Sequence, residues 1–155
     1  MSQFDNLIMK FRNVIVLVIV SFLSVQAFAQ TQAFTLHVKI TDIRNTKGRI
    51  QLQLYKDGES FSKETPWKTL LIAKETYAKG NSLMYDVVGI PAGTYGIAIL
   101  DDENSDTKMN YSFLMPTEGF GFSNYYHTAW SKPKFDSFKF TVNNNLNINI
   151  KVRYV

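Results

Sequence analysis

Apolar and polar residues alternate along much of this chain, and no other feature constrains its fold as strongly. Leu36, Val38 and Ile40, for example, are separated from one another by single polar residues. In a β-strand such residues share one face of a sheet, so each strand has one apolar and one polar face. The same period of two is found in residues 34–41, 50–54, 83–87, 95–99, 138–142 and 148–154, with a weaker segment at 67–72. The sequence therefore predicts an all-β fold, an antiparallel sandwich of about seven strands.

Clusters of turn-forming residues separate these segments. Asn45–Gly48 predicts a hairpin between the first two strands, and Pro91–Gly93 predicts a turn before the strand at 95–99. Asn143–Asn145 joins the last two strands, which we expect to pair with each other. A short helical turn is expected around residues 61–63. Residues 101–133 lack clean alternation and predict a long loop over one end of the sandwich.

The N-terminus has the pattern of an export signal. Lys10 and Arg12 precede an apolar run at residues 14–25, and Ala27-Phe28-Ala29 provides small residues at a cleavage site. We expect residues 1–29 to be a cleaved signal peptide and residues 30–155 to be a single mature domain in the periplasm or outside the cell. The alternative is an uncleaved N-terminal anchor, but the apolar run is shorter than a membrane span of about 20 residues.

Composition excludes several classes of protein. The sequence has no cysteine, which excludes disulfides and a lipid-modified cysteine at the cleavage site. The formal net charge is +4, and the lysines are scattered rather than gathered in a stripe, so we expect no nucleic-acid partner. No segment of the mature chain is apolar for long enough to span a membrane.

The order of several motifs resembles a bacterial family of small exported proteins, the domain-of-unknown-function family 2141. The resemblance is carried by Ile90–Ile97, Asp102-Glu103-Asn104 and Gly119–Asn124, and it extends from Lys47 to Tyr154. Members of the family usually have a histidine where this chain has Asp101. The resemblance to the family implies no established activity. The Pro-Ala-Gly-Thr-Tyr element is also similar to a turn of transthyretin-like, prealbumin-type sandwiches within the immunoglobulin-like class. That similarity implies structural roles for Pro91, Gly93 and Tyr95.

The acidic run after residue 100 is a candidate cation site. Asp102, Asn104 and Asp106 stand at every second position, and oxygen ligands of this kind suit calcium. One alternative is a solvated loop whose side chains bond their own backbone. Another is that Asp102 and Asn104 hold the long loop in place by accepting hydrogen bonds from its amides.

The aromatic part of the loop contains two kinds of candidates. Gly119, Phe120, Gly121 and Phe122 are expected to be structural, with bent backbone and buried rings. A surface platform for binding a glycan, a peptide or a protein is predicted from amphipathic side chains. These are Tyr125, Tyr126, His127 and Trp130.

No motif of an enzyme is present, and we assign no catalytic residue. The leading hypothesis is an exported, non-enzymatic β-sandwich that binds an unknown glycan or protein partner through residues 101–133. The second is a calcium-stabilised structural or assembly accessory protein. The third, a hydrolase that uses Asp101, Asp102 or Glu103, is disfavoured because adjacent strand residues point to opposite faces.

Overall fold

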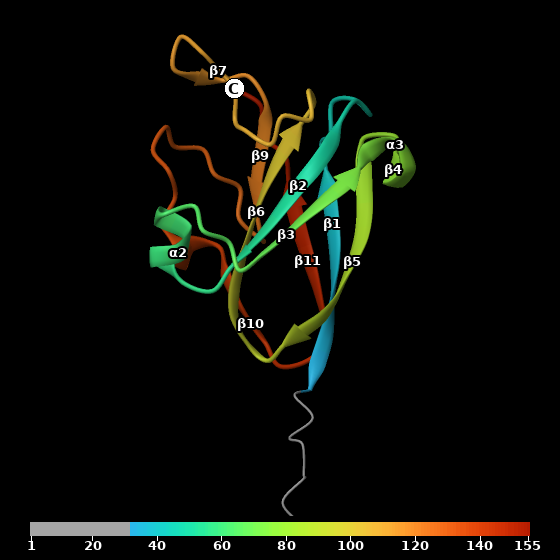
Figure 1. The fold of residues 1–155 in the computed structure, drawn as a ribbon, viewed down its shortest axis with the longest axis vertical. Helices are drawn as coiled ribbons and strands as arrows, with labels where there is room; N and C mark the ends of the chain where they lie inside the picture. The colour runs from blue at the N-terminus through green and yellow to red at the C-terminus, as the bar shows by residue number, and fades with distance from the viewer. Residues whose placement is uncertain (1–31) are drawn as a thin grey trace, which may run out of the picture. The chain divides into compact units, whose positions relative to one another are not determined.

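The computed structural model describes residues 32–155, which fold into two facing β-sheets (Figure 1). The first sheet has the order β11-β1-β5-β4. Its strands are β1 (Ala33–Thr41), β4 (Ala78–Lys79), β5 (Ser82–Pro91) and β11 (Leu146–Lys151). All pairs in this sheet are antiparallel except that of β1 with β11, which is parallel.

The second sheet is antiparallel throughout and has the order β10-β6-β2-β3. It contains β2 (Arg49–Tyr55), β3 (Lys68–Ala73), β6 (Gly93–Asp102) and β10 (Lys139–Val142). A further strand, β9 (Gly119–Phe122), also pairs with β6. The prediction of an all-β sandwich is confirmed, with short strands added to the seven that the alternation indicates.

Short elements occupy the connections. They are α2 (Gly58–Ser62), α3 (Lys74–Tyr77), the 3-10 helix η1 (Phe135–Ser137) and a small hairpin of β7 (Tyr111–Ser112) and β8 (Met115–Pro116). The helical turn expected around residues 61–63 is α2. Asp57 caps it, because the Asp57 Oδ1 accepts a hydrogen bond of 2.7 Å from the Ser60 amide.

The main core lies between the two sheets and is made by the apolar faces that the alternation predicts. Its fully buried side chains include Leu36, Ile40, Leu52, Leu54, Ile90, Ile97 and Ile148. Tyr95 is 2 % exposed and its ring belongs to this core, 5.5 Å from the ring of Trp67. The residues after the Pro91–Gly93 turn therefore place an aromatic side chain between the sheets.

A second apolar cluster covers the outer face of the β2-β6-β9 sheet. Its members are mainly aromatic: Tyr55, Phe61, Ala98, Phe122, Phe135 and Phe138. Gly96 makes room for it, since a Cβ at this position would lie 2.6 Å from the Phe138 ring. Phe120 packs against the edge of the cluster. Both faces of this sheet are thus covered over part of its length.

Two connections differ from the predictions. Asn45–Gly48 does not form a hairpin, because β1 and β2 belong to different sheets. The last two strands do not pair either: β10 lies beside β6, and β11 lies at the edge of the other sheet beside β1. In both places the turn residues reverse the chain, but the reversal carries it across the core to the opposite sheet.

The two sheets meet at one edge. The backbone of Phe120 in β9 exchanges two hydrogen bonds with Arg153, at 3.0 and 2.8 Å. Gly119 and Gly121 permit this approach, because a Cβ at Gly119 would lie 2.5 Å from Val152 and one at Gly121 would lie 2.7 Å from Ile150. The glycines are therefore required by packing.

The predicted signal peptide lies outside the described residues. Within residues 32–155, no helix has the length and apolar character needed to cross a membrane.

Candidate functional site

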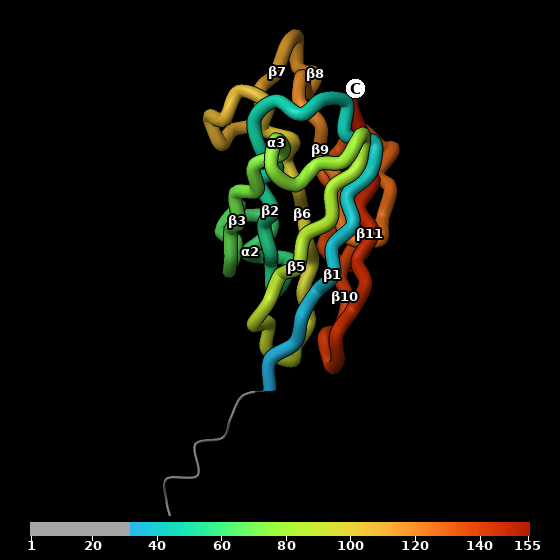
Figure 2. Tube along the Cα trace, turned by 90° about the vertical axis from the view of Figure 1, so that its right-hand side faces the viewer, coloured from blue at the N-terminus to red at the C-terminus, as the bar shows by residue number. Residues whose placement is uncertain are grey.

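The first part of the loop segment (residues 101–133), from Asp102 to Glu118, lies at the end of the sandwich where β6 terminates. After it, β9 runs back along β6, and Lys132 contacts Phe61 of α2. Figures 1 and 2 show the β7–β8 hairpin protruding beyond the ends of both sheets. The base of the segment is held by a set of buried acidic side chains, and its tip is apolar. The contacts at the base determine how the tip is presented to solvent.

Asp101 is completely buried on the core-facing side of β6. Its carboxylate accepts hydrogen bonds from the Lys74 ammonium and the Tyr154 hydroxyl. Lys74, the first residue of α3, is also completely buried, and its Nζ donates to Asn45 Oδ1 at 3.3 Å. Burial and then the hydrogen bond to Asp101 raise the pKa of Tyr154. Buried charges are tolerated only when they are paired, so this group ties β6 to α3 and to the C-terminal segment.

Asp102 points to the opposite side of β6 and is also completely buried. Its Oδ2 accepts hydrogen bonds from Arg49 Nε at 2.8 Å and from the Thr107 amide at 3.1 Å. Its Oδ1 accepts one from the Asp106 amide at 3.0 Å. One carboxylate therefore folds the chain after β6 back onto the start of β2. Asp102 thus has the role given by the third alternative in the sequence analysis, in which it accepts hydrogen bonds from backbone amides of the loop.

Glu103 forms a third anchor. Arg44 donates to both of its carboxylate oxygens, from Nε at 2.6 Å and from Nη2 at 3.0 Å, and also to the Thr117 carbonyl at 2.9 Å. Asn45 Nδ2 donates to Glu103 Oε1 at 3.0 Å. These contacts, above all the hydrogen bond with Arg44, lower the pKa of Glu103 and raise the pKa of Arg44. The ion pair joins the two arms of the loop segment, before and after the hairpin.

Glu118 closes the base from the other arm. It is 4 % exposed, and its two oxygens accept hydrogen bonds from the Glu103 amide at 3.0 Å and the Asn110 amide at 3.3 Å. Burial is the largest influence on its carboxyl, and the nearby charges of Asp102 and Asp106 add to it, so its pKa is raised. Glu118 therefore fixes the two strands that lead into and out of the hairpin.

The residues predicted as calcium ligands are bonded to one another and to the loop. Asn104 Nδ2 donates to Asp106 Oδ2 at 3.0 Å, so an amide donor faces the carboxylate. The carboxylates of Asp102, Asp106 and Glu118 lie within 4.8 Å of one another. Each of the three already accepts hydrogen bonds from protein amides. Protein donors thus already bind these carboxylates, and the calcium site at Asp102, Asn104 and Asp106 stays a prediction.

Replacing Glu103 by Gln should make the free energy of unfolding depend less on pH in the acid range. A carboxyl whose folded pKa is lowered adds stability above its unfolded value, here about 4.5, and loses that contribution as the pH falls through the folded pKa. We expect Glu103→Gln to lower the free energy of unfolding at pH 7 by about 1–2 kcal/mol. The difference from wild type should shrink as the pH drops below 4.5. Urea unfolding at several pH values measures it.

The matched control is Glu64→Gln, which changes an exposed carboxylate paired with Lys132. We expect that change to be too small to measure, because exposed ion pairs add little stability. A Glu103→Gln variant that lost the same stability at acid pH as at pH 7 would refute the proposed role of the charge.

The tip of the hairpin is its most unusual feature. Phe113 and Leu114 form the two-residue connection between β7 and β8, and they are 99 % and 94 % exposed. Both have positive φ, 47° and 68°. Two-residue hairpin turns with this backbone normally carry Asn and Gly, because bulky residues are strained there by about 1–2 kcal/mol each. Two large apolar side chains are therefore held in solvent by a strained turn.

The predicted aromatic platform is only partly present. Tyr126 and Trp130 are 48 % and 77 % exposed, as a surface role requires. His127 is only 6 % exposed, and its Nε2 lies 2.6 Å from the Ser131 carbonyl, so its placement on the surface platform was wrong. Tyr125 and Tyr126 line one shallow hollow of about 460 Å³, and neither His127 nor Trp130 lines it. The structure brings Tyr125 and His127 into contact, with ring centres 5.8 Å apart, but the four side chains do not line one common hollow.

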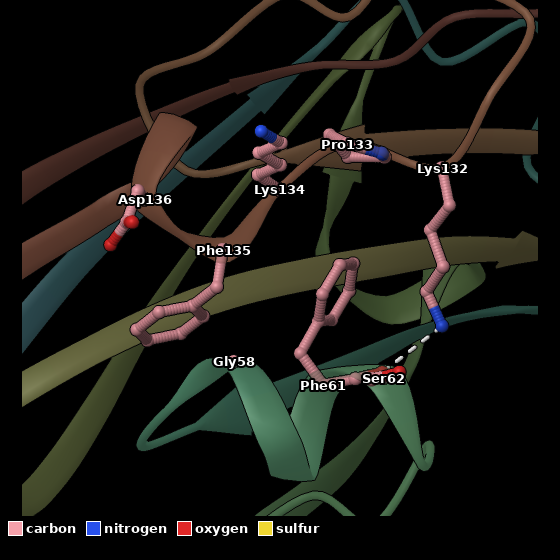
Figure 3. A pocket seen from close by; sticks show the side chains of 8 residues that line it. All are labelled: Gly58, Phe61, Ser62, Lys132, Pro133, Lys134, Phe135 and Asp136. Atoms are coloured by element: carbon pink, nitrogen blue, oxygen red, sulfur yellow. Dashed lines mark hydrogen bonds between the residues drawn. The ribbon is translucent and has the colours of Figure 1, made fainter.

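Another hollow, of about 470 Å³, lies where α2 faces the end of the loop segment (Figure 3). Its walls are the rings of Phe61 and Phe135 and the stem of Lys132. The Lys132 ammonium lies 4.5 Å from the centre of the Phe61 ring and donates to the Phe61 carbonyl at 3.0 Å. These contacts fasten the far end of the loop segment to α2.

Several residues of this site were not predicted from the sequence. Arg44, Arg49, Lys74, Glu118 and Tyr154 carry no motif, and their partners are distant in the chain. Nothing in the sequence distinguished Phe113 and Leu114 from the many other large apolar residues of the loop segment. The one available signal was Tyr111 to Pro116, a short apolar run between two polar segments.

The comparisons with known proteins place the chain in a family. A family model described as "Uncharacterized protein conserved in bacteria (DUF2141)" matches residues 38–150. The chain belongs to this family. The family resemblance seen in the sequence motifs is thereby confirmed, while the likeness to transthyretin stays a prediction. The DUF2141 match includes the whole loop segment and its hairpin. No curated protein and no solved structure matches the chain.

Proposed function

We propose that this protein is an exported, non-enzymatic binding module that docks onto a partner protein through the tip of the β7–β8 hairpin. The observation that carries the proposal is the near-complete exposure of Phe113 and Leu114 at positive φ. Backbone strain and exposed apolar side chains both cost stability, and such features are concentrated at functional sites. A partner with an apolar pocket would recover part of this cost.

Burial of the tip would contribute a substantial part of the free energy of a specific contact. Full burial of a Phe or Leu side chain is worth about 1.5–3 kcal/mol, so the two together would supply about 3–6 kcal/mol. Tyr111, which is 65 % exposed at the base of the same hairpin, adds an amphipathic ring beside them. A small central apolar group with a polar surround is the usual composition of a binding hot spot.

The buried acidic base supports the proposal because it organises the tip in advance. Asp102 and Glu118 accept hydrogen bonds from backbone amides of the arm before the hairpin, and Glu118 itself lies on the arm after it. Glu103 pairs with Arg44, which also donates to the Thr117 carbonyl on the second arm. A tip held in its binding conformation loses less conformational entropy on docking. In this proposal, Asp102, Glu103 and Glu118 do not contact the partner but hold the hairpin tip in position.

The charges around the tip favour a protein over a lipid surface. Contact with anionic lipid is usually strengthened by a cluster of four to eight basic residues. At the base of the hairpin, the charge of Lys108 is close to that of Asp106, and Arg44 is paired with Glu103. This mixed and nearly neutral surround lacks the attraction that an anionic membrane would provide.

The absence of enzymatic activity is part of the proposal. Asp101 and Asp102 are both fully buried and engaged with Lys74 and Arg49 respectively. His127 is buried against the Ser131 carbonyl. In this proposal these side chains stabilise the loop segment and do not act on a substrate. Export is inferred from the N-terminal sequence pattern alone.

Photo-cross-linking in the native cells tests the docking site. A photoreactive amino acid at Tyr111 should give a discrete cross-linked product, and the same group at Met84 should not. Met84 is a matched control, because it is 68 % exposed but lies on β5 in the other sheet. We expect Phe113→Asp with Leu114→Asp to reduce the Tyr111 product at least tenfold. Equal products from both positions, or a Tyr111 product unaffected by the aspartates, would contradict the proposal.

Vesicles distinguish the lipid alternative. Purified protein should stay in the supernatant when phosphatidylglycerol vesicles are sedimented. Sedimentation with the vesicles that depends on Phe113 would assign the tip to a membrane surface and would overturn the protein partner.

A further inference from the structure

The last strand of the second sheet, β3, has one open edge. It pairs with β2 along Lys68–Ala73, and no strand within residues 32–155 pairs with its other side. β3 and β5 belong to the side of the domain that faces the viewer in Figure 2. An open strand edge is a template for pairing with a further strand, so natural sheets usually protect their edges.

The hydrogen-bond pattern of β3 shows which main-chain groups face the open edge. The Lys74 amide donates to the Gly48 carbonyl at 3.3 Å, and bonded pairs alternate along an antiparallel ladder. Every second residue counted back from Lys74 therefore bonds to β2. The N–H and C=O groups of the residues in between, which are Thr69, Leu71 and Ala73, point away from β2. All three residues are exposed, so the edge presents a row of unpaired donors and acceptors.

This edge lacks the usual protection. Prolines, bulges and charged side chains normally keep other strands from adding to an edge. Residues 69–73 read Thr-Leu-Leu-Ile-Ala, without a charge or a proline. By contrast, the neighbouring strand β5 has a register shift between Val87 and Ile90 and includes Gly89 at a φ of +74°. At the centre of the β3 edge, Leu71 is 51 % exposed.

We propose that β3 of one copy pairs antiparallel with β3 of a second copy, which forms a symmetric dimer with one continuous sheet. A two-fold axis at Leu71 sets this residue opposite its own counterpart and sets Thr69 opposite Ala73. On the core side, the same register sets the half-buried Leu70 opposite Ile72. Leucine and isoleucine side chains therefore meet on both faces. Within residues 69–73 no like charges stand opposite each other, as a self-complementary interface requires.

The charges at the two ends of β3 favour a second copy as the partner. Lys68 begins the strand, and the exposed Glu75 lies just after its end, in the first turn of α3. Lys74, which stands between them, is buried and paired with Asp101, so its charge is not presented to a second copy. Antiparallel pairing brings the basic start of one β3 toward the acidic residue that follows the other. Two-fold symmetry makes this favourable contact twice.

Further apolar side chains flank the open edge. Trp67 precedes β3, Tyr77 ends α3, and Val88 lies on β5, where its carbonyl accepts a hydrogen bond from Lys68 Nζ at 3.4 Å. All three apolar side chains are exposed, and their burial would add to the main-chain hydrogen bonds of the dimer. The hairpin tip belongs to neither β3 nor α3, so dimer formation is separate from the proposed docking function.

Sedimentation equilibrium of the purified protein tests the dimer. Wild type at about 100 µM should have the mass of two chains. Leu71→Lys and Leu71→Glu should each raise the dissociation constant at least tenfold, because each sets two like charges opposite each other at the axis. An equimolar mixture of the two variants should regain the mass of two chains, since Lys then faces Glu. Thermal unfolding checks that each variant is folded.

Met84→Lys is the matched control, because it adds the same charge at an exposed apolar residue of the other sheet. This variant should remain a dimer. Phe113→Asp with Leu114→Asp should also remain a dimer, which separates a failure of docking from a failure of the dimer.

Three results would overturn the inference. The first is a single-chain mass for wild type at about 100 µM, which would leave the edge to a strand of another protein. The second is a Leu71→Lys variant, or a mixture of the Lys and Glu variants, whose dissociation constant differs from these expectations. The third is loss of the dimer in the Met84 variant or in the tip variant, which would place the interface elsewhere.

Discussion

Replacing Lys74 by Met should lower the free energy of unfolding by about 3–5 kcal/mol, the largest effect that we expect from a single side chain. Lys74 and Asp101 are both completely buried and bonded to each other. Without the ammonium, the carboxylate would be left in the core with the Tyr154 hydroxyl as its remaining side-chain donor. An uncompensated buried charge is far more costly than the loss of the pair as a whole. Urea unfolding of the purified variants measures the effect.

A double variant separates the charge from the packing. Lys74→Met with Asp101→Asn removes both charges and keeps an acceptor for Tyr154, so it should recover most of the lost stability. Lys63→Met is the surface control: Lys63 and Glu59 form an exposed pair, and its loss should change little. A double variant no more stable than Lys74→Met alone would show that volume, not charge, decides the cost.

Gly48→Ala should be the second severe substitution, at about 2–5 kcal/mol. Gly48 has a φ of +68°, which costs an alanine about 1–2 kcal/mol. In addition, a Cβ at this position would lie 2.2 Å from the Asp102 carbonyl oxygen and 2.7 Å from the Glu103 backbone. The backbone would have to move, at a further cost of about 1–3 kcal/mol, and it would carry the anchors of the loop segment with it.

Gly89→Ala isolates the two contributions. Gly89 has a similar φ of +74°, but an added Cβ would meet no atom within 4 Å. We therefore expect Gly89→Ala to cost only the backbone strain, about 1–2 kcal/mol. Equal losses of stability in the two variants would mean that Gly48 matters only for its backbone conformation and not for its contact with Asp102.

The strands were predictable because burial of one face is a local property of the sequence. Leu36, Val38 and Ile40 identify β1 without knowledge of its neighbours. The pairing of strands was less predictable. Asn45–Gly48 indicates a reversal of the chain, but the same residues serve a hairpin and a crossing to the opposite sheet. The polar face of β2 was also misleading, because an aromatic cluster from distant segments covers part of it.

The site was predictable in location but not in its contacts. The acidic run and the loop over one end of the sandwich are visible in the sequence, and Asp101 and Asp102 point to opposite faces as strand geometry requires. Their partners are not visible, since Lys74 is 27 residues and Tyr154 is 53 residues from Asp101. The exposure of an aromatic side chain cannot be read from the loop sequence either: the His127 ring packs against Phe122 and Tyr125 and is buried, while Phe113 in the same loop segment is exposed.

The most direct test of a docking tip is the backbone dynamics of the free protein, measured by 15N relaxation at residues 111–116. A tip that is held ready for docking should have order parameters close to those of β2 and β6, about 0.85. Ring signals of Phe113 should show no contacts with the body of the domain, as its exposure requires. Order parameters below about 0.6, or contacts that place Phe113 against the sandwich, would contradict a preorganised and exposed docking tip.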